Sequence, residues 1–381
     1  MIATQVTLGD VADLASGFAF KSQQFLDGKE DGVYLLRGDN VQQGYIRWGD
    51  KAKKWRQEDY EELERYQLQK DDVILAMDRP IVGGGLKLAW IKDQDLPSLL
   101  VQRVCRIRGM QSVARTNYLR YALSAPDFLA HIDRITTGAN IPHISGRDIS
   151  DFELRLPSLD IQDQIVETLS AYDNLIENNQ RQIALLEESA QLLYNHWIVN
   201  FKCPGAKIGS NGIPCGWAIG TLSDLVTLHY GKALKDADRK PGDIAVYGSS
   251  GIVGTHTTAL VDGPALVVGR KGNVGSVFFS KTGCFPIDTV YYVAASQATF
   301  FNYFTLKAQS FVSSDTAVPG LNRSYAYSLP VLKPSDDVLQ LFEQVVSTFF
   351  EQRDNLIQQC GRLREARGML LPRLVSGEIE C

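Results

Sequence analysis

The fold is decided by residues 158–200, which read SLDIQDQIVETLSAYDNLIENNQRQIALLEESAQLLYNHWIVN. Mostly apolar positions recur along this stretch at alternating spacings of four and three, the 3.5-residue period of a coiled-coil seam. From Ile161 to Trp197 such a helix would span about 55 Å at 1.5 Å per residue, which exceeds the width of a small domain. We therefore predict a helix that projects from its domain and needs a partner. Its seam positions are Ile165, Leu169, Tyr172, Ile176, Asn179, Ile183, Leu186, Leu193 and Trp197.

Residues 335–381 carry a second helix of the same kind. Both helices open with Pro-Ser-x-Asp, at 157–160 and 334–337, which predicts a serine N-cap and a carboxylate near the positive end of the helix dipole. Pro372 and Gly377 are predicted to end the second helix. Its seam positions are Phe342, Val346, Phe349, Leu356, Cys360, Leu363 and Leu370.

The two helices are predicted to pair as an antiparallel coiled coil. The alternative is two ordinary amphipathic helices, each lying on its own domain. Asn179 and Cys360 occupy matching seam positions in this pairing. Asn179 then either fixes the register as a buried polar residue or lies at a loose, solvated part of the seam.

The remaining two segments of the chain resemble each other in sequence, as an internal repeat. Thr7-Leu8-Gly9-Asp10 recurs as Thr221-Leu222-Ser223-Asp224, and further matches follow in the same order. Because the order is shared, these weak matches together predict a duplicated unit. The further matches align residues 36–40 with 246–250, Arg79 with Arg270, and Ile141-Pro142 with Val318-Pro319.

Short β-like runs separated by glycine-containing turns fill both copies, at 73–76, 101–107, 265–268 and 290–293. Helices are predicted at 117–135 and, as its counterpart, at 302–311. The fold class is therefore mixed α+β, with two pseudo-repeated globular domains separated by two long helices. The predicted boundaries are 1–157 for the first domain, 158–200 for the central helix, 201–334 for the second domain, and 335–381 for the C-terminal helix and tail.

The composition excludes several classes of protein. A chain of 381 residues with 44% apolar residues can build more than one core. No apolar run approaches the roughly 18–20 residues that span a bilayer, and no secretory signal opens the chain, so no membrane partner is expected. The six cysteines form no CxxC pair, which indicates reduced thiols and a cytoplasmic protein.

Charge is distributed unevenly along the chain. Residues 158–200 hold 1 Lys or Arg against 7 Asp or Glu, whereas residues 201–334 hold 12 against 7. The acidic central helix is a poor ligand for a polyanion and suits a protein partner better. The basic second domain, in contrast, suits contact with phosphates.

No motif of an enzyme appears. The sequence contains no phosphate loop, no glycine-rich dinucleotide fingerprint, no Asn-Pro-Pro-aromatic tetrapeptide and no nucleophile elbow. Its five histidines are dispersed, so no metal site is predicted. The chain is interpreted as a binding protein without catalytic residues.

The alternating plan of globular segment and long helix resembles the specificity subunit of Type I restriction-modification enzymes. The closing phrase at 370–379, LLPRLVSGEI, carries the resemblance best, and Leu156-Pro157 with Gln164-Ile165, residues 246–252 and Arg270-Lys271-Gly272 also fit. The resemblance implies two target-recognition domains that each read half of a bipartite sequence in double-stranded DNA. It also implies a helical spacer that sets the half-site separation.

The resemblance further implies partners and their cofactors. Two modification subunits, which hold S-adenosylmethionine and methylate adenine, would dock on the helices. Motor-nuclease subunits, which use ATP and Mg²⁺, would complete the assembly. The present chain would hold no cofactor of its own.

Candidate DNA-contacting residues follow from turns and basic side chains. Arg270 and Lys271 lie on a glycine-flanked turn after an apolar strand, where arginine can fork onto guanine and lysine can meet a phosphate. The basic run 51–56 is followed by acidic residues, so pairing within the chain is an alternative there. The DNA-binding candidates are Arg37, Asp39, Asn40, Lys51, Lys53, Lys54, Arg56, Arg79, His143, Tyr247, Ser249, Ser250, Arg270, Lys271, Asn273, Asn322 and Arg323.

Two alternatives from other classes stay open. The chain could be a scaffold whose two end domains hold proteins, which binding to bare duplex DNA at several salt concentrations would test. It could also be an enzyme with an unfamiliar hydrolytic site, which a cleft of acidic and basic groups with perturbed pKa values would indicate.

Overall fold

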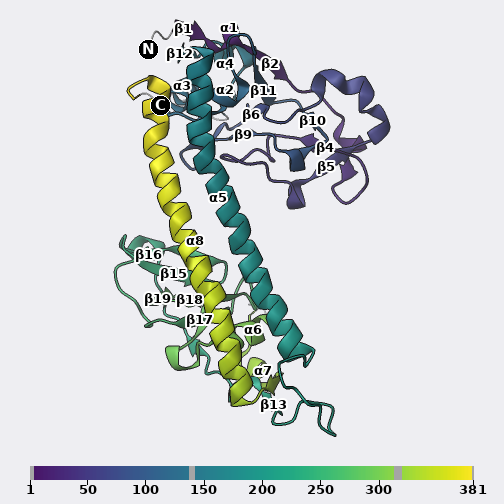
Figure 1. Cartoon of the computed structure of the whole chain (residues 1–381), viewed down its shortest axis with the longest axis vertical. Coiled ribbons are helices and arrows are strands. Elements are labelled where there is room, and N and C mark those ends of the chain that lie inside the picture. The colour runs from purple at the N-terminus through teal and green to yellow at the C-terminus, as the bar shows by residue number, and fades with distance from the viewer. Residues whose placement is uncertain (1–3, 137–141, 313–319, 380–381) are drawn as a thin grey trace. The chain divides into compact units, whose positions relative to one another are not determined.

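The computed structural model describes residues 4–136, 142–312 and 320–379. The chain forms two compact units, Met1–Asn178 with Gln359–Cys381 (unit 1) and Asn179–Gln358 (unit 2). Two long helices, α5 (Leu159–Tyr194) and α8 (Asp336–Ser376), each contribute one segment to both units (Figure 1). No helix in the described ranges combines the length and apolar character of a membrane-crossing segment.

Unit 1 is built on antiparallel sheet. β1 (Thr4–Thr7) pairs with β12 (Glu153–Leu156). The central sheet has the order β2 (Ala12–Ser16), β11 (Val104–Gly109), β6 (Val73–Ala76), β9 (Leu88–Trp90). A second sheet has the order β10 (Ser98–Leu100), β4 (Val33–Leu36), β5 (Lys53–Trp55), β3 (Leu26–Asp27), in which β10 and β4 are parallel, and β7 (Ile81–Val82) forms a hairpin with β8 (Gly85–Leu86).

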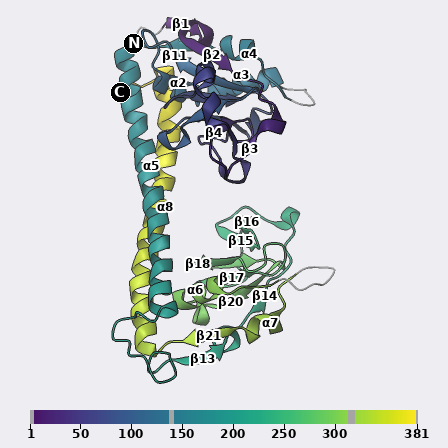
Figure 2. The ribbon, with the colours of Figure 1, turned by 90° about the vertical axis from the view of Figure 1, so that its right-hand side faces the viewer.

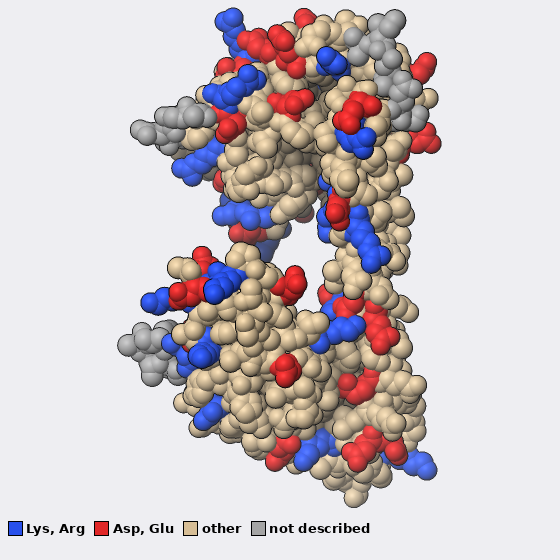
Figure 3. Space-filling model, turned by 90° about the vertical axis from the view of Figure 1, so that its left-hand side faces the viewer, with Lys and Arg blue, Asp and Glu red and all other residues tan. Residues whose placement is uncertain are grey.

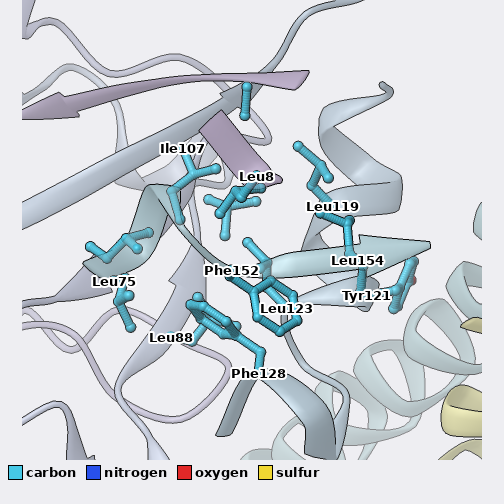
Figure 4. Packing of buried hydrophobic residues seen from close by; sticks show 14 of the residues in the cluster. Leu8, Leu75, Leu88, Ile107, Leu119, Tyr121, Leu123, Phe128, Phe152 and Leu154 are labelled. Carbon is cyan, nitrogen blue, oxygen red and sulfur yellow. The ribbon is translucent and has the colours of Figure 1, made fainter. Parts of the chain in front are cut away.

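The helices of unit 1 cover one side of the central sheet. They are α1 (Leu8–Val11), α2 (Thr116–Ala122), α3 (Pro126–Thr136) and α4 (Gly146–Ser150). Leucine, isoleucine and phenylalanine side chains from these helices and from the strands meet in one core, where Leu8, Ile107 and Phe128 are fully buried (Figure 4). Short 3₁₀ helices occupy the loops at Ser22–Gln24, Gly49–Lys51, Gln57–Asp59, Glu61–Tyr66 and Asp93–Asp95.

Unit 2 has a similar set of sheets. β13 (Ala218–Thr221) pairs with β21 (Pro330–Lys333). The central sheet has the order β14 (His229–Tyr230), β20 (Val290–Val293), β17 (Ala265–Gly269), β18 (Val277–Ser280), and a second sheet has the order β16 (Gly251–His256), β15 (Ile244–Gly248), β19 (Cys284–Pro286). α6 (Phe300–Ala308) lies between the central sheet and α8 (Figure 2), and α7 (Arg323–Ser328) precedes β21. A π-helix at Asn195–Val199 follows α5, and 3₁₀ helices lie at Leu222–Asp224, Asp236–Asp238 and Ala295–Gln297.

Three predicted elements were wrong in their bounds. The single helix at 117–135 is two helices, α2 and α3, because Pro126 lacks an N–H and disfavours helical backbone at the residue before it. The strand predicted at 101–107 begins only at Val104, as β11, because residues 101–103 form the connection from β10, in which Arg103 has φ +64°. The helix predicted at 302–311 begins earlier and ends sooner, as α6.

The end of α8 also differs from the prediction. Pro372 lies inside α8, which continues to Ser376 and ends at Gly377 with φ +74°. The following turn carries Leu374, which is buried in the core of unit 1. Burial of that side chain offsets the hydrogen bond that a proline removes from a helix.

Within each unit the segments of α5 and α8 lie side by side and run in opposite directions (Figures 1 and 2). In unit 1, Ile165 and Leu169 of α5 pack in the same core as Leu374 of α8. In unit 2, Ala190 and Tyr194 of α5 pack against Phe342, Val346 and Phe350 of α8. Every predicted seam position is buried or half-buried.

Ion pairs join the globular part of each unit to a long helix and join the two long helices to each other. In unit 1, Asp173 on α5 accepts hydrogen bonds from Arg120 of α2, at 2.9 Å, and from Arg367 of α8. In unit 2, Arg353 of α8 pairs with Glu187 of α5 at 3.4 Å, while its neighbour Asp354 pairs with Lys281 of the loop after β18 at 3.3 Å.

Two further side chains of the long helices hold backbone groups of the globular parts. Gln162 of α5, fully buried, accepts the N–H of Arg115 at 2.8 Å and donates to the carbonyl of Val113 at 2.9 Å. Glu343 of α8 accepts the first two N–H groups of α6, from Phe300 at 2.9 Å and Phe301 at 2.7 Å. Burial raises the pKa of Glu343, and these two hydrogen bonds only partly oppose the increase.

Candidate nucleic-acid interface

The loop after β17 in unit 2 is fixed by its own backbone. The N–H groups of Arg270 and Lys271 both donate to the carbonyl of Thr289, at 2.9 and 3.0 Å. Asn273 N–H donates to Ser249 Oγ at 3.4 Å, so the loop rests on the turn between β15 and β16. Four of the predicted residues, Arg270, Lys271, Asn273 and Ser249, are thereby brought together. Ser250, which follows Ser249 in the chain, is exposed.

The side chain of Arg270 is held on several sides. Its Nη2 donates to the carbonyl of Asp288 at 2.9 Å, and its Nε is buried without a partner among the described residues. The guanidinium lies over the rings of Tyr230 and Tyr291, at 5.2 and 5.8 Å from their centroids. This geometry does not leave both edge nitrogens free for a fork onto a base.

Arg323 lies on the other segment that reaches this place. Its guanidinium is 5.0 Å from the centroid of the same Tyr230 ring, and its Nη1 donates to the carbonyl of Leu228 at 3.5 Å. The preceding residue, Asn322, accepts the N–H of Tyr325 at 3.1 Å and so acts as the N-cap of α7. Val318 and Pro319, which the sequence aligned with Ile141-Pro142, lie outside the described residues.

Tyr230 was not among the residues predicted from the sequence. Its side chain is 52% exposed, and its ring contacts the guanidinium groups of both Arg270 and Arg323. Its strand, β14, has only two residues and gives no periodic signal. The arginines that approach it are distant in sequence. In contrast, the predicted Tyr247 is buried against Phe278 and offers little surface to a ligand.

In unit 1 the structure brings Arg79 and His143 together. Arg79, which has φ +45°, donates its N–H to the carbonyl of Pro142 at 2.8 Å. His143 Nδ1 lies 2.6 Å from Asp78 Oδ1, and Arg103 donates to the other oxygen of Asp78 at 2.9 Å. Burial acts to raise the pKa of Asp78, but the hydrogen bonds from His143 and Arg103 outweigh it and lower that pKa.

The loop after β4 holds three other predicted residues. Arg37 Nη2 donates to the carbonyl of Lys51 at 2.8 Å. Asn40 is fully buried, accepts the N–H of Arg37 at 3.0 Å and donates to the carbonyl of Arg47 at 3.0 Å. Asn40 therefore shapes the loop and has no surface for a ligand, whereas its neighbour Asp39 is exposed.

The basic run 51–56 is partly paired within the chain, as the alternative interpretation anticipated. Lys53 pairs with Asp27 at 3.3 Å, and Arg56 lies 3.9 Å from Glu58. Lys54 donates to the carbonyl of Glu30 at 2.7 Å. Lys51 is exposed, and its carbonyl accepts the bond from Arg37.

A slender hairpin was also missed. β7 and β8 are joined by Gly83 and Gly84, which have φ of +57° and +80°, and a Cβ added at either glycine would meet no atom within 4 Å. Gln43 donates to the carbonyl of Val82, so the hairpin is tied to the loop after β4. Nearby, burial lowers the pKa of Lys87, while Asp39 and Asp78 act against the decrease.

Matching hydrogen bonds relate positions of the two units. The same contact is made by different residues in each unit, with Gly17 corresponding to Gly231 and Met77 to Arg270. In unit 1 the bonds run from Gly17 N to Val104 O, from Phe18 N to Leu100 O, from Met77 N to Arg103 O and from Ile144 N to Met77 O. In unit 2 the corresponding bonds, in the same order, run from Gly231 N to Val290 O, from Lys232 N to Pro286 O, from Arg270 N to Thr289 O and from Leu321 N to Arg270 O. By these bonds Arg270 corresponds to Met77, so the predicted alignment of Arg79 with Arg270 was wrong by two residues. The backbone takes a positive φ at Arg79 in unit 1, two residues after Met77, and at Gly272 in unit 2, two residues after Arg270.

Charges of both signs are interspersed over the face drawn in Figure 3, and neither sign covers it. Among the described residues no group of three or more His, Cys, Asp or Glu side chains is arranged to hold a metal ion. The candidate surfaces are thus local clusters of arginine, lysine and tyrosine on loops.

Comparisons with known proteins assign the family. The model of the Type I restriction modification DNA specificity domain matches residues 3–188 and 214–335. The specificity subunit of the Type I restriction enzyme MjaVIII from Methanocaldococcus jannaschii is 33% identical over 193 residues, which are 50% of this chain and 44% of that protein. The specificity subunit of the EcoAI enzyme from Escherichia coli is 32% identical over 170 residues, which are 45% of this chain and 28% of that protein.

The fold has a solved counterpart as well. The crystal structure of a Type I restriction-modification S subunit from M. genitalium aligns over 98% of this chain and 96% of its own length, with a TM-score of 0.59 and 17% identity. Since the family model covers more than half of the chain, the protein belongs to the family of Type I restriction-modification specificity subunits. The alignments span less than half the length of the MjaVIII and EcoAI subunits.

Proposed function

We propose that this chain is the DNA-sequence-recognition subunit of a Type I restriction-modification complex. The observation that carries the proposal is the family match, which falls in two separate blocks, one on each globular part. Residues 1–157 and 201–334 would act as two target-recognition domains, each reading one half of a bipartite target in double-stranded DNA. The site of action would be the cytoplasm.

The two domains are proposed to descend from a duplicated unit. The central sheets support this, since β2-β11-β6-β9 and β14-β20-β17-β18 have the same order of connections. The pairs β1 with β12 and β13 with β21 also close each domain in the same way. The four matching backbone hydrogen bonds in the two units also support a common origin of the domains.

The helices of 158–200 and 335–381 are proposed to form an antiparallel coiled coil that fixes the half-site spacing. Support comes from the buried seam positions in each unit and from the opposed direction of the packed segments. A rigid spacer would turn two weak half-site contacts into one joint binding event. The ion pairs of Asp173 with Arg120 and of Asp354 with Lys281 would hold each reading domain to that spacer.

The same helices are proposed to dock two modification subunits. In unit 2 a groove of about 440 Å³ lies between α5 and α8, lined by Leu185, Leu186 and Leu356 together with polar side chains. Exposed apolar residues continue on the helices, including Leu175 and Met369 in unit 1. Exposed apolar side chains of this kind are typical of surfaces that a protein partner covers.

No catalytic role is proposed for this chain. S-adenosylmethionine would be held by the modification subunits, and ATP with Mg²⁺ by the motor-nuclease subunits. Several candidates with exposed or half-buried side chains stay proposed contacts to DNA, among them Asp39, Lys51, Arg79, His143, Ser250, Arg270, Lys271, Asn273 and Arg323.

Sequencing of methylated adenines tests the function. The chain is expressed with a cognate modification subunit in a host that lacks adenine methylation, and the genome is read by single-molecule sequencing. We expect one bipartite motif with a fixed number of unspecified bases between its halves. Cells that express the modification subunit alone are the control. A continuous motif, or methylation that does not depend on this chain, would contradict the proposal.

A further inference from the structure

Three residues form a cationic aromatic cluster at the edge of the central sheet of unit 2. Tyr230 lies on β14, and the guanidinium groups of Arg270 and Arg323 approach its ring to 5.2 and 5.0 Å from the centroid. Tyr291 is the cross-strand neighbour of Tyr230, with ring centroids 5.0 Å apart. We call Tyr230, Arg270 and Arg323 the YRR cluster.

The YRR cluster carries positive charge that the described residues do not neutralise. The ion pairs found in the described part of unit 2 involve other cations, namely Arg239, Lys281 and Arg353. Burial, followed by the neighbouring Tyr230, raises the pKa of Tyr291 to about 12, so this phenol is neutral at physiological pH. Two guanidinium groups near one ring repel each other, and an anion between them would relieve that repulsion.

The YRR cluster is not required by the fold. Register and hydrogen bonds place Ser16 and Met77 of unit 1 where unit 2 has Tyr230 and Arg270. There Ser16 Oγ simply donates to Met77 Sδ at 3.9 Å. Arg323 follows the N-cap of α7, and its counterpart after the N-cap Ser145 is Gly146. A neutral set of residues thus occupies the same framework in unit 1.

We infer that the YRR cluster binds the phosphodiester backbone of DNA at the half-site read by unit 2, an inference that rests on the proposed function. Arg270 is fixed by Asp288 and by the two tyrosine rings, so it can offer single hydrogen bonds and charge but no free fork for a guanine. Single, charge-assisted contacts of this kind are what a phosphate oxygen accepts. The exposed Tyr230 contributes its ring as a platform for both cations.

The assignment makes the two domains unequal. Unit 2 would hold the backbone through the YRR cluster, whereas unit 1 lacks it. The charge of the sequence agrees, since residues 201–334 hold 12 Lys or Arg against 7 Asp or Glu and residues 1–157 hold 21 against 22. Loss of the YRR cluster should therefore lower affinity for any duplex while the methylated sequence stays the same.

The test uses the complex of this chain with its modification subunits. The variants are the double substitution Arg270→Met with Arg323→Ala, and Tyr230→Ser, because methionine and serine already fit these positions in unit 1. Lys207→Met, which removes an exposed charge from the same unit, is the matched control. Binding is measured by fluorescence anisotropy over a series of salt concentrations, on a duplex that carries the methylated motif and on a scrambled duplex.

We expect the double variant to bind both duplexes about tenfold more weakly and to lower the slope of log K against log salt by about two, one for each lost phosphate contact. Unchanged affinity and slope would overturn the inference. A relaxed methylation motif at one half-site with an unchanged slope would overturn it too, because it would indicate base reading. If the wild-type complex gave no bipartite motif, the proposed function would fail, and this result is separate from the variant comparison.

Discussion

At the scale of single residues, burial decides which polar side chains build the loops and which face outward. Asn40 and Gln162 are fully buried, and their side-chain amides form hydrogen bonds with backbone groups. Lys271 and Asn273 lie on a loop that the backbone already holds, so their side chains are spared for other contacts. A polar residue on a turn is therefore a candidate contact only once its burial is known.

Glu343 offers a test of burial through pH. Its folded-state pKa is raised by burial, so the folded state binds the proton more tightly than the unfolded state does. The stability that this group contributes is then full below its ordinary pKa and falls as pH rises through the raised value. We expect the free energy of unfolding of the wild type, relative to Glu343→Gln, to decrease as the pH rises above the ordinary pKa of a glutamate.

Urea denaturation of the two proteins at several pH values measures this difference. Glu351→Gln, an exposed position on the same helix, is the control and should show no such trend. A wild type that gains stability relative to Glu343→Gln as pH rises would contradict the assignment.

At the scale of elements, ion pairs join each globular part to a long helix, through Asp173 of α5 in unit 1 and Asp354 of α8 in unit 2. Asp173 joins Arg120 of α2 to Arg367 of α8, and only 16% of its side chain is exposed. Removal of one member of such a buried group leaves the others without compensation, which is costlier than loss of a surface pair.

We expect Asp173→Asn to destabilise unit 1 by about 2–4 kcal/mol, because two arginines lose their common partner. Asp163→Asn is a matched control on the same helix, since Asp163 is more exposed and pairs with Arg115 at 3.0 Å. Its cost should stay below about 1 kcal/mol. Thermal unfolding followed by circular dichroism gives both values, and equal effects for the two variants would refute the role of Asp173.

At the scale of the whole molecule, the proposed spacer predicts a change in the DNA target. Seven residues are duplicated in each long helix at the boundary between the units, after Asn178 in α5 and after Gln358 in α8. The duplications keep the seam in phase and lengthen each helix by about 10 Å. We expect the unspecified part of the methylated motif to grow by up to about three base pairs, with both half-sites unchanged.

Single-molecule sequencing reads the new motif directly. Duplication in α5 alone is the control and should abolish methylation, because helices of unequal length cannot keep their seams in register. An unchanged spacing in the double duplication would mean that the helices do not measure the target.

Much of this architecture could be predicted from the sequence, because long periodic segments carry their own signal. The mixed fold class, the two long helices and the strands at 73–76 and 290–293 are confirmed. The division of the helix at 117–135 was also readable, since Pro126 lies in its middle. Tyr230 was beyond reach, because only the folded sheet brings its two-residue strand to Arg270 and Arg323.

The cap that Glu343 places on α6 has a consequence for chimeras. The glutamate belongs to a long helix, while the N–H groups that it holds belong to the globular part. A foreign reading domain grafted between the helices would be separated from the helix residue that caps it in the donor. Its first helical N–H groups would then face the residue at position 343 of the recipient. Compatibility between donor and recipient would then depend on position 343, as well as on Asp354, because a graft of the globular segment alone transfers neither residue.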